Sequence, residues 1–212
     1  MSMKKKSKFL TVLYSGIAGT ISFFIGGLLA TALILLTDQY LLAIPFSGLL
    51  GGLLLTVFNR NWNNICRFTL GAVIAVSVGF LGTFVLCEGI FSLIGMFTDI
   101  FAGQIENIIS ISLMGVVFGI IFSMIVYGKK ALVLFAVVCG IIELPCIYLA
   151  DKVYFIEPLK NLITKFGLVD VNLLFIVLGF GIGTGVSIGL IKISGKDEIG
   201  LQSSDSQTTE ET

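Results

Sequence analysis

The residue best suited to chemistry in this 212-residue chain is Glu143, an acidic side chain inside an apolar stretch. The surrounding sequence reads Cys139-Gly-Ile-Ile-Glu-Leu-Pro-Cys-Ile-Tyr-Leu-Ala150, so that Gly140 precedes the carboxyl and Pro145 follows it. A charged group at the centre of a bilayer costs about 2.5–3.5 kcal/mol on insertion scales, and it normally faces a partner or water. Proline lacks the N–H that a continuous helix uses, which predicts a helix break beside Glu143.

A second carboxyl, Glu88, closes another apolar stretch and is followed by Gly89. We expect both glutamates in the outer half of the membrane, where their shared depth would bring them together. One interpretation is a pair that responds to protons or cations, or a polar lining for a substrate path. The other is structural, with each carboxyl hydrogen-bonded to Ser, Thr or backbone that Pro145 leaves free. Both remain open, and the structural one is favoured for Glu143.

Other reactive groups are sparse. The chain contains no His, and its four cysteines at 66, 87, 139 and 146 have no CxxC spacing, which argues against zinc and haem patterns. No Ser/His/Asp, Cys/His or acidic cluster can be assembled, so we expect neither an enzyme nor a cofactor or metal site. The run Gly179-Phe-Gly-Ile-Gly-Thr-Gly185 lacks the strand and the acidic residue of a nucleotide-binding fingerprint and indicates close helix packing instead.

Composition assigns the fold class. The chain is 56% hydrophobic and 12% charged, whereas soluble domains carry about 25% charged residues. An apolar helix of about 20 residues crosses the hydrocarbon core of a bilayer. The sequence therefore predicts an all-α, polytopic transmembrane bundle of six spans: Phe9–Leu36, Leu41–Phe58, Phe68–Cys87, Ile108–Tyr127, Ala131–Ala150 and Leu173–Ile193. For the third span, a tilted helix that extends to Phe97 is the alternative.

The basic residues predict the orientation, because cytoplasmic loops carry the excess of Lys and Arg. With both termini in the cytoplasm, the inner segments hold ten of these residues: Lys4, Lys5, Lys6, Lys8, Arg60, Arg67, Lys129, Lys130, Lys192 and Lys196. The outer segments hold three, namely Lys152, Lys160 and Lys165. This predicts a basic cytoplasmic N-terminus over 1–8, a membrane domain over 9–193 and a disordered cytoplasmic tail over 194–212.

Shorter patterns predict how the spans connect and pack. The connection Tyr127–Lys130 is so short that spans four and five must form an antiparallel hairpin. We expect span three to end near Glu88 with an interfacial segment after it, and a short amphipathic helix after Pro158. Small residues four apart allow helix backbones to approach, which places span six inside the bundle or in a dimer seam. The pairs are Ser15/Gly19, Gly48/Gly52 and Gly115/Gly119, with the glycines of 179–189 in span six.

Two segments resemble the stage II sporulation protein M-like multi-pass membrane proteins, over roughly residues 60–150. Asn63-Asn-Ile-Cys-Arg-Phe-Thr-Leu-Gly71, continuing to Cys87-Glu-Gly89, is similar to that family's paired-Asn entry into a Gly-rich span. Cys139–Ala150 is similar to its Glu-Leu-Pro segment. The chain departs from the family at Val138-Cys139, where Pro-His is frequent, at Glu88-Gly89, where Asn-Gly is frequent, and in the absence of an acidic residue from span six.

The resemblance implies a helical membrane protein without known enzymatic activity. Sporulating bacteria use one such protein to organise cell-wall remodelling during engulfment, and relatives accompany export and maturation systems, including those of circular bacteriocins. The leading hypothesis is therefore a non-enzymatic, multi-pass scaffold or accessory protein of a prokaryotic cytoplasmic membrane. The alternative is a small transporter or permease component that uses Glu88 and Glu143. Expected partners are membrane lipids and other membrane proteins or further copies of the chain, and no nucleic acid. The candidate site residues are Glu143, Pro145, Gly140, Glu88, Gly89, Asn63 and Asn64.

Overall fold

The computed structural model describes residues 3–83, 85, 89, 104–153 and 171–194, and its elements over these residues are all helices. Within the described residues, five segments are long and apolar enough to cross a membrane, which confirms an all-α, membrane-embedded class of protein. They are Lys8–Thr37, Tyr40–Phe58, Trp62–Gly82, Ile109–Val126 and Leu173–Ser194. The helices are α1 (Met3–Thr37), α2 (Tyr40–Phe58), α3 (Ile65–Ser77), α5 (Gln104–Val126), α6 (Leu132–Val153) and α8 (Val171–Ser194).

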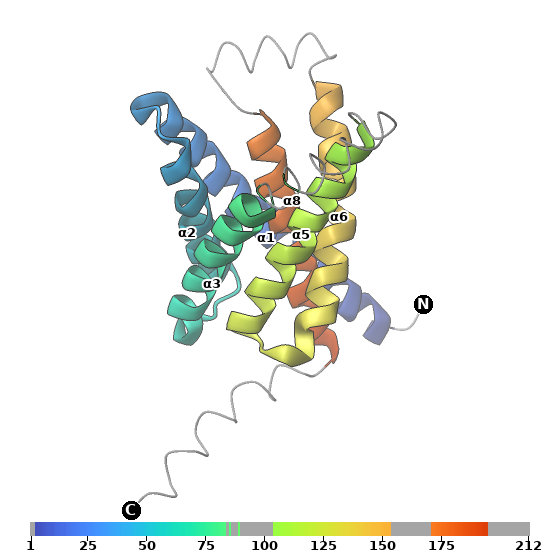
Figure 1. Ribbon diagram of the computed structural model, residues 1–212. Helices are drawn as coiled ribbons and strands as arrows, with labels where there is room; N and C mark the ends of the chain where they lie inside the picture. The colour runs from blue at the N-terminus through green and yellow to red at the C-terminus, as the bar shows by residue number, and fades with distance from the viewer. Residues whose placement is uncertain (1–2, 84, 86–88, 90–103, 154–170, 195–212) are drawn as a thin grey trace, which may run out of the picture.

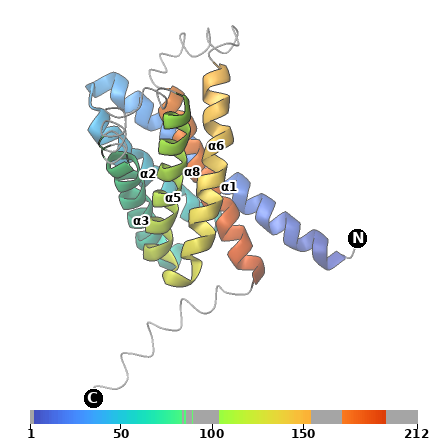
Figure 2. The ribbon, with the colours of Figure 1, turned by 45° about the vertical axis from the view of Figure 1, so that its right-hand side comes forward.

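Their arrangement is a closed bundle in which each helix packs on the next along the chain. The ring is closed by α8, which lies between α6 and α1 (Figure 1). Over the most apolar stretch of α8, 72% of the residues are buried inside the bundle, whereas 33% are buried over the most apolar stretch of α5. The expectation that the last span lies inside the bundle is therefore confirmed. The long helix α1 runs obliquely across the bundle, and its first turns extend away from the other helices (Figure 2).

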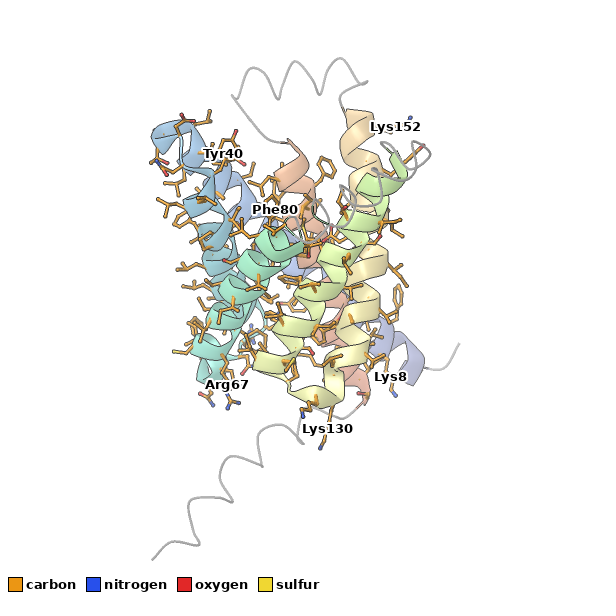
Figure 3. All side chains as sticks on the ribbon, viewed as in Figure 1. Lys8, Tyr40, Arg67, Phe80, Lys130 and Lys152 are labelled. Atoms are coloured by element: carbon orange, nitrogen blue, oxygen red, sulfur yellow. The ribbon has the colours of Figure 1, made fainter. Side chains whose placement is uncertain are left out.

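Basic side chains mark one end of the bundle. Lys8, Arg67 and Lys130 lie at this end, whereas Lys152 lies at the opposite end (Figure 3). Lys192 is at the basic end too, since its Nζ donates a hydrogen bond to Oδ1 of Asn59 at 2.8 Å. This bond ties the last turn of α8 to the connection between α2 and α3. The segregation of charge that the sequence predicts is therefore present along the bundle axis.

Two rows of glycine let α8 approach both neighbours. Gly181 and Gly185 face α1, where an added Cβ on Gly185 would lie 3.0 Å from Cα of Gly16. Gly183 faces α6, where an added Cβ would lie 2.9 Å from Cα of Cys139. Residues four apart share one helix face. Successive residues of an α-helix are rotated by about 100°, so two rows that are offset by two residues point in nearly opposite directions, about 200° apart. The glycine run is thus a two-sided packing surface, as expected for close helix packing.

The third span differs from a regular helix at its far end. After Ser77, α3 continues as a π-helix over Val78–Gly82. Gly79 in this turn faces α5, because an added Cβ would lie 3.3 Å from Cβ of Phe118. Such π turns accommodate an extra residue within a helix. The expected helix end near Glu88, the interfacial segment after it, the amphipathic helix after Pro158 and the C-terminal tail lie outside the described residues.

A break at Pro145 is wrong, because α6 runs unbroken from Leu132 to Val153 with Pro145 inside it. Helix α2 likewise continues without a break through Pro45. Proline removes one intrahelical hydrogen bond, but in a membrane helix local adjustment and neighbouring helices compensate for it. Pro145 is also exposed on the outside of the bundle, so its ring displaces no neighbouring helix.

The hairpin between α5 and α6 turns at Gly128, which has φ +73°. We expect Gly128→Ala to lower the free energy of unfolding by about 1 kcal/mol, because this conformation disfavours a Cβ even where space is open. Unfolding in mixed micelles of mild and denaturing detergent measures the change. The matched control is Gly82→Ala, whose added Cβ would have its nearest neighbour at 3.6 Å. Equal losses for both variants would contradict the conformational argument.

Candidate functional site

Glu143 lies near the midpoint of α6 with none of its side chain exposed. Cys139 precedes it by four residues and Cys146 follows it by three, so the three side chains share one face of the helix. This face is directed into the bundle, since all three residues are buried. Neighbouring positions 141 and 144 are exposed on the outside. The carboxyl is therefore held in the interior of the bundle.

Two glycines from other helices make room for this side chain. On α5, an added Cβ at Gly115 would lie 2.5 Å from Cγ of Glu143. On α8, an added Cβ at Gly179 would lie 2.6 Å from Cδ and from each carboxyl oxygen. Any larger residue at either position would occupy space that the glutamate uses. We call the enclosure formed by Gly115, Gly179 and the α6 face of Glu143 the glycine cradle.

The carboxyl has no hydrogen-bonding partner among the described residues. Both of its oxygens are buried and neither takes part in a hydrogen bond. The other buried oxygens of this kind are hydroxyls, on Ser15, Thr69, Thr83 and Ser187. Most buried polar groups in proteins are paired, and an unpaired one needs an explanation. The hydrogen bonds that the structural interpretation expects for Glu143 are absent from the described residues.

An aromatic cluster adjoins the cradle. Phe118 of α5 stacks on Phe180 of α8, with ring centroids 4.2 Å apart and planes inclined by 2°. These residues follow the two cradle glycines closely, by three positions on α5 and by one on α8. Further contacts extend the cluster to Phe23 and Phe122. All four rings are fully buried inside the bundle.

No family model matches this chain, and no curated protein or solved structure is significantly similar to it. The geometry of the cradle and the distribution of charge are therefore the features that bear on function.

Three other described candidates, Gly140, Asn63 and Asn64, do not contact the carboxyl of Glu143 in the glycine cradle. Gly140 is on α6 but faces α5, where an added Cβ would lie 2.6 Å from Cγ2 of Val116. Asn63 and Asn64 form part of the Trp62–Asn64 turn between α2 and α3, next to the start of the helix that carries Arg67. There Nδ2 of Asn64 donates a hydrogen bond to Oδ1 of Asn61 at 3.0 Å, and Asn63 is exposed. The paired asparagines therefore shape a turn at the basic end.

The expected pairing of the two glutamates is not tested, because Glu88 lies outside the described residues. Gly89 is described and exposed, with open space where a Cβ would be. Gly115 and Gly179 were not predicted to belong to the site. The sequence indicated them only as positions of close helix packing. Their separation from Glu143 by 28 and 36 residues gives no local signal that they meet it.

Proposed function

We propose that the chain is a non-enzymatic, multi-pass membrane scaffold or accessory protein of the stage II sporulation protein M-like type. In this role it supports a membrane machinery for cell-envelope remodelling or for peptide export and maturation. The observation that carries the proposal is the enclosure of Glu143 between α5, α6 and α8. A substrate path needs a polar group that is reachable from water. A fully buried carboxyl at a three-helix junction instead favours a role in holding the bundle in one arrangement.

The proposal includes six spans with both termini in the cytoplasm. Helix α6 has 22 residues, about 33 Å at 1.5 Å per residue, which is enough to cross the hydrocarbon core beside the five other spans. The end that carries Lys8, Arg67 and Lys130 would face the cytoplasm under the positive-inside rule. Cysteine accessibility at the two ends of α6, probed from each side of the membrane, tests this orientation.

The test of the function follows protein level and partner association together. Tagged wild type, Glu143→Gln and Glu143→Ala are purified after chemical cross-linking in native membranes. We expect Glu143→Ala to lower the membrane level and to lose cross-linked membrane proteins, because the cradle collapses around the shorter side chain. The matched control is Ile141→Ala on the same helix, since Ile141 is 61% exposed on the outside of the bundle. If both Glu143 variants reached the wild-type level in the membrane and were cross-linked to the same membrane proteins as the wild type, the proposal would be contradicted.

The permease alternative has a separate test. Purified protein in proteoliposomes is tested for ion-driven or potential-driven flux. A scaffold shows none, whereas a permease component shows a flux that Glu143→Gln abolishes. Such a flux would replace the proposed function with the alternative.

A further inference from the structure

The glycine cradle fits one carboxyl side chain and leaves no room for a second group. Its walls contact Glu143 at Cγ on the α5 side and at the carboxyl group on the α8 side. The Cβ positions at both glycines fall within 2.6 Å of the glutamate, so even a methyl group there would collide with it. The shape of the cavity is therefore set by the side chain of Glu143 itself.

Among the described residues of α5, α6 and α8, none that faces this carboxyl supplies a positive charge. On α6 the titratable groups beside it are the thiols of Cys139 and Cys146, which are free and buried. The described part of α8 carries no titratable side chain before Lys192, which lies at the basic end. On α5, residues 109–126 contain no charged residue. An ionised carboxylate here would be buried with neither a counter-charge nor a hydrogen-bond donor among the described residues, which is the costliest state for such a group.

Metal cations fit the cradle poorly. Hard cations take about six oxygen ligands, or keep several waters. Here the carboxyl oxygens of Glu143 meet the Cα region of Gly179, and the described residues contain no cluster of ligands for a metal. A proton needs only the two oxygens of the carboxyl group itself.

Helix α6 is weakened beside the carboxyl. Pro145 has no N–H to donate to the carbonyl of Ile141, so one hydrogen bond of the helix is missing across the turn that contains Glu143. Helices bend most readily at such positions. A bend of α6 at this turn would move Glu143 away from Gly179 and open the contact between α6 and α8.

We propose that the glycine cradle is a proton-binding site within the membrane-embedded bundle, where Glu143 holds a proton as the neutral acid and exchanges it with water when α6 bends at Pro145. Binding forms the O–H bond of the carboxylic acid, and release returns the proton to water and leaves the carboxylate. The site does not depend on the proposed scaffold function, because it follows from the enclosure of one side chain.

Infrared spectroscopy of the protein in lipid nanodiscs tests the bound proton. We expect the carbonyl stretch of a protonated carboxylic acid at neutral pH, shifted after transfer to D₂O. This band should be lost in Glu143→Gln and retained in Glu88→Gln, the matched control at the other glutamate. Labelling glutamate side chains with ¹³C in the wild type should also shift the band, which assigns it to glutamate rather than aspartate, and loss of the band in Glu143→Gln then assigns it to Glu143. Absence of an acid band that depends on Glu143 would overturn the proposal, as would a band that D₂O never shifts.

The route of exchange has a separate test. Pro145→Ala restores the missing hydrogen bond of α6, and we expect it to slow the shift of the acid band in D₂O. Pro45→Ala makes the same change in α2, away from the cradle, and should leave the exchange rate at the wild-type value. Equal exchange rates in both variants and the wild type would overturn bending at Pro145 as the route.

Discussion

Replacing Gly185 by Ala is expected to lower the free energy of unfolding by roughly 2–3 kcal/mol, which is large for one added methyl group. Gly185 lies in the α1–α8 contact, where its Cα approaches backbone rather than flexible side chains. An added Cβ would lie 2.9 Å from the carbonyl carbon of Ser15 and 3.0 Å from Cα of Gly16. Neither backbone can move without separating the two helices. Unfolding of Gly185→Ala in mixed micelles measures this loss of free energy. For the larger substitution Gly185→Leu, size-exclusion chromatography in mild detergent shows whether the protein still folds.

The same contact contains its own control. Gly16 on α1 faces α8 as well, but an added Cβ there would meet only Cγ2 of Val186, at 3.4 Å. We therefore expect Gly16→Ala to change the free energy of unfolding by less than about 0.5 kcal/mol, within the usual range for tolerated substitutions. Similar losses for Gly16→Ala and Gly185→Ala would show that helix contact in general, and not backbone approach, determines the cost.

These two glycines also show what the sequence can predict about the fold. A span of about 20 apolar residues is a local property, so the helices follow from the sequence to within a few residues. Repeats of small residues four apart identify a packing face, and Gly48/Gly52 and Gly115/Gly119 all lie in helix contacts. The identity of the facing helix is a tertiary property. Nothing near Gly185 in the chain indicates that it meets α1 while Gly183 meets α6.

The candidate site illustrates the same limit. The exceptional character of Glu143 is visible in the sequence, because a carboxyl in an apolar run is rare. Its surroundings are not, since the cradle is completed by Gly115 and Gly179, which lie 28 and 36 residues away in the chain. Pro145 misleads for a related reason: its effect on an isolated helix is strong, but packing within a bundle keeps α6 continuous through it.

A double-mutant cycle measures whether Glu143 and Gly179 share the same space. Gly179→Ala is expected to cost about 1–2 kcal/mol, because its Cβ would collide with the carboxyl group. Glu143→Ala is expected to cost roughly 2–4 kcal/mol through the cavity that it leaves. The double variant should cost less than the sum by about 1–2 kcal/mol, since the methyl group at 179 enters the vacated space and its collision disappears.

A second cycle, between Glu143 and Gly115, serves as the comparison for the cycle between Glu143 and Gly179. An added Cβ at Gly115 would meet Cγ of Glu143, but it would also lie 2.8 Å from the backbone oxygen of Cys139. Truncating Glu143 removes the first collision and leaves the second, so rescue of Gly115→Ala should be only partial. Additive losses for the Gly179 pair, with a coupling energy below about 0.5 kcal/mol, would contradict the cradle. Full rescue at Gly179 with partial rescue at Gly115 would instead locate the carboxyl on the α8 side of the cradle, in agreement with the collisions at each glycine.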